Sequence, residues 1–186
     1  MISAGLLITD GVRFLAELPT GRTKSENNYD LPKGNVEENE DFLTCAFREA
    51  REETGYSFDK YKKDAVCLFY LPVKYRKDKD IILFMIKLKP EDMPDIKSYK
   101  CDSFFPDKNG KMIPEVASFD YKPLKEITKW LFKSYISIFN FDIDYIYVKN
   151  KLQMIMQTAV ETNDVNMTEF ASVVREYIAF VDPRMK

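Results

Sequence analysis

Apolar residues gather in short runs along most of the chain, and turn-forming residues separate these runs. Ile2 to Thr9 is almost wholly apolar and meets Asp10-Gly11, a dipeptide typical of a hairpin turn. The pattern predicts strands over residues 2–9, 12–18, 65–71, 80–88 and 114–121. We expect the charged segment 74–79 to join two of these strands, and residues 89–113 to form a long loop.

Other segments have helical spacing instead. A helix is predicted over residues 41–54, followed by Gly55, the residue type most common just past a helix. Its apolar stripe consists of Phe42, Leu43, Ala46, Phe47 and Ala50. Pro123 can begin another helix, whose apolar positions are Leu124, Ile127, Trp130, Leu131 and Ile138. Two further helices are predicted over residues 144–160 and 167–181.

Composition places the chain in a broad class. Its 186 residues are 45% hydrophobic and 31% charged, which is typical of one globular domain with appended structure. No run approaches the roughly 18 uncharged apolar residues that cross a membrane, and the first residues do not resemble a signal peptide. Three cysteines without metal-type spacing indicate a reducing compartment, so we expect a cytoplasmic protein with no membrane partner.

The charge distribution gives a weaker indication. A net charge of -2 offers no strong basic field for nucleic acid. Lysines cluster at residues 60–63 and 74–79, which either form solvated loops or attract phosphate groups locally.

Histidine is absent from the sequence. Catalytic triads and dyads that need histidine are therefore excluded, and so are histidine-ligated zinc sites. A general base in this chain must be a carboxylate, a lysine, a tyrosine or a cysteine.

Three carboxylates share one edge of the predicted helix 41–54. At about 100° per residue, Glu49 and Glu53 lie one turn apart, and Glu52 lies within about 100° of both. Like charges at this spacing repel each other, and the last turns of a helix disfavour anions. Either Arg48 and Arg51 neutralise a solvated face, or the carboxylates bind a hard cation such as Mg²⁺ or Mn²⁺.

The surrounding sequence favours the cation. Gly34 is followed after five residues by Glu40, and after seven more by Arg48-Glu49-Ala50-Arg51-Glu52-Glu53-Thr54-Gly55-Tyr56. This spacing resembles the catalytic signature of the nudix hydrolases, which we call the box (residues 34–56). The family usually has a bulky aliphatic residue where Ala50 and Tyr56 stand, a difference that concerns packing. The resemblance extends to the element order of residues 1–135, and not to the C-terminal helices.

The resemblance implies an α/β fold, an α/β/α sandwich around a mixed β-sheet, to which the C-terminal helices are appended. We expect a hydrolase domain over residues 1–140 and a helical extension over residues 141–186 that packs on the same domain. The apolar stripe of this extension needs burial, and a homodimer through the C-terminal helices is one way to provide it.

The resemblance also implies roles for single residues. Glu49, Glu52 and Glu53 would ligate Mg²⁺ or Mn²⁺ with help from the Gly34 carbonyl. Arg48 would hold Glu49 in place, and Glu40 would support the loop or a further metal. The general base is Glu49 or Glu53 within the box, or Glu115 in Pro114-Glu115-Val116. An ordinary strand-edge position is the alternative for Glu115.

Residues Leu31-Pro32-Lys33-Gly34 resemble the sequence that leads into the box in diadenosine polyphosphate hydrolases, and also in diphosphoinositol and RNA 5′-end enzymes. Lys33 would contact phosphate in that setting. Tyr29 either contacts substrate or packs in the core. Tyr70 or Tyr75 either stacks on a base or is a packing residue.

Together these features predict a metal-dependent pyrophosphohydrolase that cleaves a phosphoanhydride in a nucleoside diphosphate-linked substrate. The favoured substrates are a dinucleoside polyphosphate and a capped or triphosphorylated RNA 5′ end. A house-cleaning nucleoside triphosphate pyrophosphatase is the enzymatic alternative. A non-catalytic nucleotide-binding regulator is the alternative of another class, although such modules generally lose the box carboxylates that this chain keeps.

Overall fold

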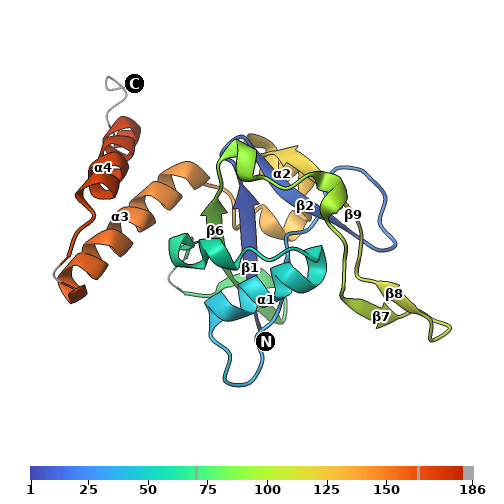
Figure 1. Ribbon diagram of the computed structural model, residues 1–186. Helices are drawn as coiled ribbons and strands as arrows, with labels where there is room; N and C mark the ends of the chain where they lie inside the picture. Colours follow the sequence, from blue (N-terminus) through green and yellow to red (C-terminus); the bar gives the residue numbers. More distant parts are fainter. Residues whose placement is uncertain (70, 163, 182–186) are drawn as a thin grey trace.

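The computed structural model describes residues 1–69, 71–162 and 164–181. Figure 1 shows a layered body from which a helix pair projects on one side and a β-hairpin on the other. The strands are β1 (Ile2–Thr9), β2 (Arg13–Pro19), β3 (Lys33–Asn35), β4 (Val66–Cys67), β5 (Val73–Arg76), β6 (Lys79–Lys87), β7 (Phe104–Pro106), β8 (Met112–Pro114) and β9 (Val116–Pro123). The α-helices are α1 (Phe42–Thr54), α2 (Ile127–Trp130), α3 (Ile143–Thr162) and α4 (Met167–Val181).

The central sheet is mixed, with the strand order β4-β6-β1-β2-β9. β1 and β6 run parallel, from Ile2 opposite Asp80 to Thr9 opposite Lys87. The other pairs are antiparallel, with β3 on β1 and β5 on β6. Because helices cover both faces of a parallel pair, its strands are apolar throughout rather than alternating. This accounts for the unbroken apolar run of β1.

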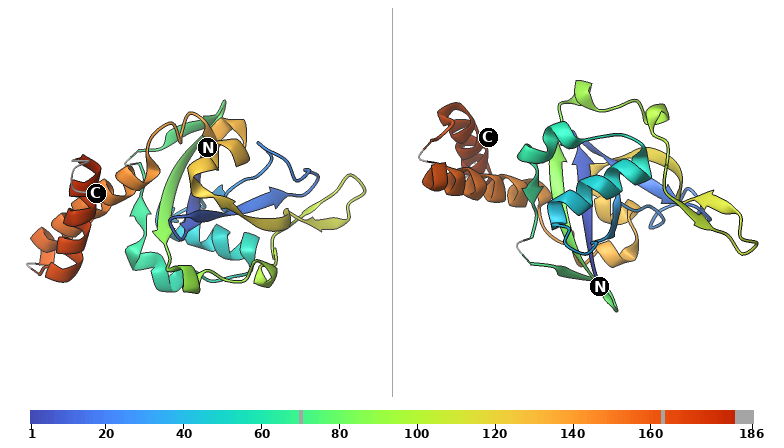
Figure 2. Two further views of the ribbon diagram at one scale, coloured as in Figure 1. Left: turned by 90° about the horizontal axis from the view of Figure 1, so that it is seen from above. Right: turned by 60° about the horizontal axis from the view of Figure 1, so that its bottom comes forward.

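Two hydrophobic clusters lie on opposite faces of the sheet, and β1 contributes alternate residues to them. Leu6 and Ile8 pack with Ala46 and Phe47 of α1 on one face. Leu7 packs on the other face, where the cluster includes residues of α2 and of the first turns of α3. Figure 2 shows α1 and the segment around α2 on opposite sides of the strands. The predicted α/β/α sandwich with appended helices is confirmed.

The strand predicted over residues 65–71 is shorter than expected. β4 ends at Cys67: the Leu68 N–H still donates to the Leu83 carbonyl of β6, but the carbonyls of Cys67 and Leu68 accept from the side-chain amide of Asn150 in α3. The charged segment 74–79 was expected to be a connection, and this was wrong for its first half. Lys74 to Arg76 belong to β5, in which Tyr75 points inward. Exposed and buried positions alternate in β5, but the charged Lys74 and Arg76 on either side of Tyr75 hide this alternation in the sequence.

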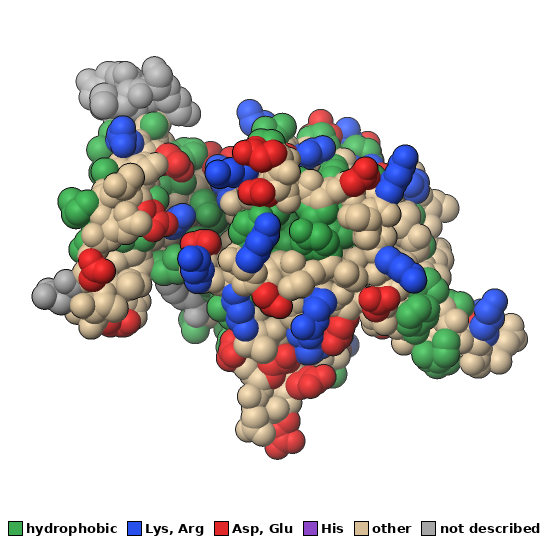
Figure 3. Space-filling view, in the orientation of Figure 1, with side chains coloured by type: hydrophobic (Ala, Val, Ile, Leu, Met, Phe, Trp, Pro, Cys, Tyr) green, Lys and Arg blue, Asp and Glu red, His purple; other side chains and the backbone are tan. Residues whose placement is uncertain are grey.

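The long loop predicted over residues 89–113 contains a β-hairpin that the sequence analysis missed. β7 and β8 flank a turn in which the Asp107 carboxylate accepts from the backbone N–H groups of Asn109 and Lys111. Gly110 adopts a φ of 80°, so the Asn109-Gly110 pair was the available signal. Phe104 and Met112 are half exposed on this hairpin, which Figure 3 shows as a projecting arm with apolar side chains on its surface.

The helix predicted from Pro123 is mostly replaced by shorter turns. Only Ile127–Trp130 is α-helical, and 3₁₀ turns form at Leu124–Glu126 and Lys133–Tyr135. The helix ends because the backbone around Leu131 pairs with Tyr29: the Tyr29 N–H donates to the Trp130 carbonyl, and the Phe132 N–H donates to the Tyr29 carbonyl. This long-range pairing leaves no trace in local apolar spacing.

The C-terminal helices differ along their length in how they are packed. Ile143, Tyr147 and Val148 of α3 are buried in the core cluster that also includes Leu7. Helix α3 also contacts α4: Tyr145 in its first turn is stacked on Tyr177 at 6.1 Å between ring centroids, and Lys151 further along pairs with Glu169 at 3.0 Å. Figures 1 and 2 show α4 and the end of α3 projecting away from the sheet. The described residues contain no helix long and apolar enough to cross a membrane.

Candidate active site

Helix α1 is fixed at both ends. The Asp41 carboxylate caps the first turn by accepting from the Thr44 backbone N–H at 2.9 Å and from the Thr44 hydroxyl at 2.6 Å. Gly55 ends the helix with a φ of 67°, and its N–H donates to the Arg51 carbonyl at 2.7 Å. The side chains between these two caps therefore have defined positions.

Arg48 donates hydrogen bonds to three carboxylates beside α1. Its Nε and Nη2 donate to the two oxygens of Glu40 at 2.8 and 2.9 Å. Its Nη1 donates to Glu49 at 2.7 Å and to Glu52 at 3.2 Å. These bonds to Arg48 lower the pKa of Glu40 to about 2. Glu40 thus joins the start of the box to α1 through Arg48.

A hollow of about 420 Å³ lies beside this edge. It is lined by Ser3, Lys33, Gly34, Asn35, Val36, Glu37, Glu49, Glu52, Tyr75, Arg76, Lys79, Ser103 and Glu115. The carboxylates of Glu49 and Glu52 come from α1, whereas Glu115 comes from the segment between β8 and β9. The hollow therefore brings together two parts of the chain that are distant in the sequence.

The carboxylates around the hollow repel one another. Burial raises the pKa of Glu49, the Arg48 guanidinium opposes this, and the negative charges of Glu52 and Glu115 raise it further. Glu115 is held by its backbone: its N–H donates to the Ser103 carbonyl, and its carbonyl accepts from the Thr20 N–H. Oxygen donors that repel one another around an open space fit the coordination preference of Mg²⁺ and Mn²⁺.

Gly34 lies directly against Glu49. A Cβ atom built at Gly34 would overlap the carboxylate of Glu49. Only glycine allows β3 and α1 to approach this closely, so the box needs a glycine at this point for steric reasons. The donor set and this close contact both fit a divalent cation. Within residues 1–69, 71–162 and 164–181, however, no three Asp, Glu or Cys side chains are already gathered around a single ion position.

Glu53 differs from its neighbours on α1 because it faces inward. Its side chain is 7% exposed, it is not part of the hollow's lining, and its Oε2 accepts from the Lys33 backbone N–H at 2.7 Å. Burial raises the pKa of Glu53 to about 8, against the opposing charge of Lys33. The Lys33 ammonium pairs with Asp30 at 2.7 Å and also lines the hollow.

The sequence analysis missed Glu17, which lies in β2 beneath this network. It is 1% exposed, and one of its carboxylate oxygens has no hydrogen-bond partner among the residues that the structure describes. Burial, and then the charges of Glu53 and Asp30, raise the pKa of Glu17 well above its ordinary value. A single acidic residue within the apolar run 14–18 was the available signal, since an unpaired buried carboxylate is costly.

The predicted substrate residues have different surroundings. Tyr29 is 1% exposed, and its hydroxyl donates to Asp120 at 2.5 Å. This burial fits the core-packing alternative for Tyr29 rather than contact with substrate. Tyr70 lies outside the described residues. Tyr75 lines the hollow, although it is only 5% exposed. Arg76 and Lys79 of the lysine-rich segment 74–79 line it too, which favours phosphate attraction over a solvated loop for these two.

Comparisons with known proteins agree on one family. The family model of the NUDIX domain matches residues 2–130. The 17.7 kDa protein of the e-segB intergenic region of Enterobacteria phage T4 is 35% identical over 135 residues, which are 69% of this chain and 84% of that protein.

One solved structure shows the same fold, and a second is similar with a lower TM-score. The NUDIX domain of Shewanella oneidensis NrtR, crystallised with ADP ribose, is similar with a TM-score of 0.50 and 12% identity, over 75% of this chain and 84% of that one. A C. elegans Ap4A hydrolase is similar with a TM-score of 0.43 and 18% identity, over 97% of this chain and 96% of that one.

Proposed function

The chain belongs to the NUDIX domain family and is a nudix hydrolase of phosphorus-containing acid anhydrides, and from that premise we propose that it cleaves the phosphoanhydride of a dinucleoside polyphosphate or of a capped or triphosphorylated RNA 5′ end. One observation carries the proposal. The hollow beside α1 has the carboxylates of Glu49, Glu52 and Glu115 on part of its wall and the cations of Arg76 and Lys79 elsewhere. A polyphosphate with bound divalent cations needs both kinds of group.

We propose Mg²⁺ or Mn²⁺ as the cofactor, held by Glu49, Glu52 and Glu53 with the Gly34 carbonyl, and with Glu40 as support or as a further ligand. Such an ion neutralises phosphate charge and lowers the pKa of bound water. Glu53 can ligate only if its Oε1 turns toward the hollow, since its Oε2 accepts from the Lys33 N–H. Arg48 orients Glu49 through the bond at 2.7 Å.

The general base is Glu49, Glu53 or Glu115. Glu49 and Glu115 line the hollow, and a raised pKa makes Glu49 a better proton acceptor than an ordinary carboxylate. These observations favour Glu49, with Glu115 next. Lys33 contacts phosphate in this proposal, although Asp30 already pairs with its ammonium. We assign Tyr29 a packing role.

The proposal is tested first at Glu52. We expect Glu52→Gln to lower kcat by more than about 100-fold with Mg²⁺, because it removes one anionic donor without changing shape. Glu91→Gln, a change at an exposed position that does not line the hollow, is the matched control. Weaker Mn²⁺ binding in calorimetry should accompany the loss. Undiminished turnover in Glu52→Gln would rule out its assignment as a metal ligand.

A substrate panel then separates the enzymatic alternatives. Dinucleoside polyphosphates, capped and triphosphorylated RNA and nucleoside triphosphates are incubated with Mg²⁺, and the released nucleotides are identified. The proposal expects faster release from the first two groups. Faster release of pyrophosphate from nucleoside triphosphates would favour the house-cleaning alternative instead.

We further propose that residues 141–186 form a helical extension of the hydrolase domain 1–140 and contribute to a homodimer. The exposed apolar side chains of Met156, Val160 and Met167 on α3 and α4 support this. A mass in solution equal to one chain would contradict the dimer. The three free thiols support our proposal of a cytoplasmic location.

A further inference from the structure

Arg76 and Lys79, which line the hollow, and Arg22, which shares an aromatic neighbour with Arg76, have no carboxylate partner among the described residues. Arg48 and Lys33 are paired with acidic side chains at 3.2 Å or less. Among the described residues, no ion pair forms at Arg22, Arg76 or Lys79, although Lys79 donates weakly to the Asn35 side chain at 3.4 Å. Other surface lysines are also unpaired, so the absence of a partner is not sufficient by itself to indicate a site.

Two of these cations share one aromatic ring, and this separates them from the other surface charges. The guanidinium carbon of Arg22, from the loop after β2, lies 5.4 Å from the ring centroid of Phe132. The guanidinium carbon of Arg76, from β5, lies 5.7 Å from the same centroid and 4.7 Å from that of Tyr75. The Arg76 Nη2 also donates to the Tyr75 hydroxyl at 2.9 Å. Three separate parts of the chain therefore meet at Phe132, and two of them bring a guanidinium group to its ring.

These contacts orient the two arginines without neutralising them. A cation above an aromatic face keeps its full charge, and a guanidinium keeps donors free for other partners. Two like charges beside one ring repel each other unless an anion lies between them. The guanidinium fork matches the oxygens of a phosphate group better than an ammonium does.

Arg76 also connects this pair with the candidate active site, since it lines the same hollow as Glu49 and Glu52. A polyphosphate chain whose reacting anhydride lies at the carboxylates would have its further phosphates elsewhere in the hollow or at its margin. The carboxylate part of the wall repels those phosphates, and the arginine part attracts them.

We propose that Arg22 and Arg76, held on Phe132, form a second phosphate subsite that selects substrates with three or more phosphates over those with two. This inference rests on the proposed function, because it assumes that the reacting anhydride lies at the box. It assigns the selection of substrate length to residues outside the box.

The first experiment measures binding rather than turnover. Calorimetry in EDTA compares inorganic tripolyphosphate with inorganic pyrophosphate. We expect Arg22→Met and Arg76→Met each to weaken tripolyphosphate binding by about tenfold and pyrophosphate binding by less than about twofold. Arg76→Lys, which keeps the charge, should retain most of the affinity. Equal loss for both ligands, or no loss for either, would overturn the inference.

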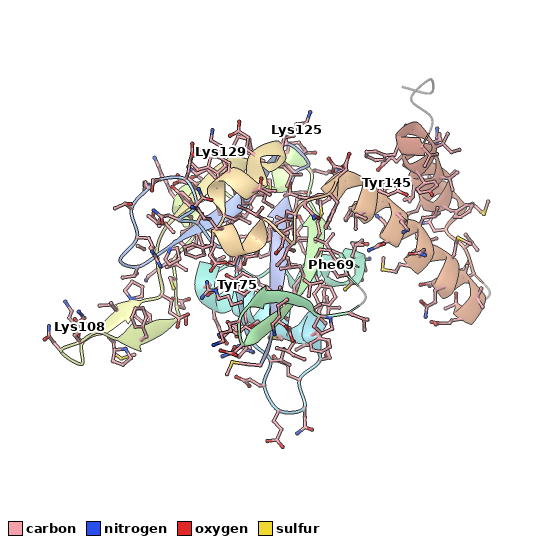
Figure 4. All side chains as sticks on the ribbon, turned by 180° about the vertical axis from the view of Figure 1, so that it is seen from behind. Phe69, Tyr75, Lys108, Lys125, Lys129 and Tyr145 are labelled. Atoms are coloured by element: carbon pink, nitrogen blue, oxygen red, sulfur yellow. The ribbon has the colours of Figure 1, made fainter. Side chains whose placement is uncertain are left out.

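Lys108 provides the matched control. Figure 4 shows Lys108 at the tip of the β7–β8 hairpin, whereas Tyr75, the neighbour of Arg76, lies on the body of the domain. Lys108→Met removes the same charge without touching the proposed subsite. We expect unchanged affinity for both ligands, and a loss equal to that of Arg76→Met would overturn the inference by showing a general charge effect.

The second experiment measures kinetics with Mg²⁺. In Arg22→Met we expect KM for diadenosine tetraphosphate to rise about tenfold, while KM for ADP ribose and kcat for both stay within about twofold. Equal KM changes for both substrates would overturn this inference and leave the proposed function intact. If the wild-type protein hydrolyses neither these compounds nor the capped and triphosphorylated RNA of the substrate panel, the proposed function fails, and the tripolyphosphate measurement still decides whether the subsite exists.

Discussion

Polar side chains are buried beneath both α1 and α3, and the two sets differ in how completely their polar atoms have hydrogen-bond or ion-pair partners. Beneath α1, the Lys33 ammonium pairs with Asp30 and its charge also acts on Glu17 and Glu53, and one oxygen of Glu17 has no hydrogen-bond partner in the described part of the chain. Beneath α3, the amide of Asn150 donates to two backbone carbonyls at 2.8 and 3.2 Å.

The difference indicates what each region does. An amide that completes the hydrogen bonds of a strand end stabilises the fold. Excess buried carboxyls destabilise it, and they are typical of places where charge is needed for chemistry. We therefore expect substitutions near α1 to change activity more than stability, and substitutions beneath α3 to do the reverse.

The largest effect is expected at Gly34. Gly34→Ala places a methyl group on the carboxylate of Glu49 and forces that side chain to move. Displacing a catalytic group by about 1 Å can lower the rate about 100-fold, so we expect a loss of kcat of this size with little change in Tm. Gly110→Ala is the control: its Cβ meets no neighbour, but its φ of 80° is strained, so stability should fall while kcat is retained. Full activity in Gly34→Ala would show that Glu49 need not occupy its present position.

Asn150 should behave in the opposite way. Asn150→Ala leaves the carbonyls of Cys67 and Leu68 without their amide donor, which should lower the free energy of unfolding by about 1–3 kcal/mol. Denaturant titration measures this, and kcat of the folded protein should change by less than about twofold. Gln157→Ala, at an exposed position of the same helix, should change stability by less than about 0.5 kcal/mol. A comparable loss in both variants would remove the special role of Asn150.

The smallest effect is expected at Glu17, where the substitution should raise stability rather than lower it. Because the folded protein raises the pKa of Glu17 above its ordinary value of 4.5, the folded state binds this proton more tightly than the unfolded state does. Stability from this group is present below about pH 4.5 and is lost as pH rises toward the folded pKa. Glu17→Gln does not titrate, so in EDTA its Tm should exceed that of the wild type at about pH 8 and equal it at about pH 4. A lower Tm in Glu17→Gln at about pH 8 would mean that the ionised carboxylate is stabilising.

Much of the fold could be predicted because its signals are local. The apolar run of β1, the stripe of α1 and the caps Asp41 and Gly55 all act within a few residues, and the structure has these elements at the predicted places. The end of α2 could not be predicted, since it depends on backbone pairing with Tyr29, about a hundred residues earlier in the sequence. The brief β4 likewise depends on Asn150 of α3.

The same distinction between local and long-range signals applies to the candidate site. The sequence by itself determined the reaction class, because residues 34–56 resemble the nudix signature; its spacing also places carboxylates on one helix edge, and the lack of histidine leaves carboxylates as the leading choice of base. Only the tertiary structure decided which of them face the hollow. Glu49 and Glu52 do, whereas Glu53 turns inward to Lys33. It also brought Glu115, Arg76 and the buried Glu17 to this site, since strands distant in the sequence become neighbours only when the sheet forms.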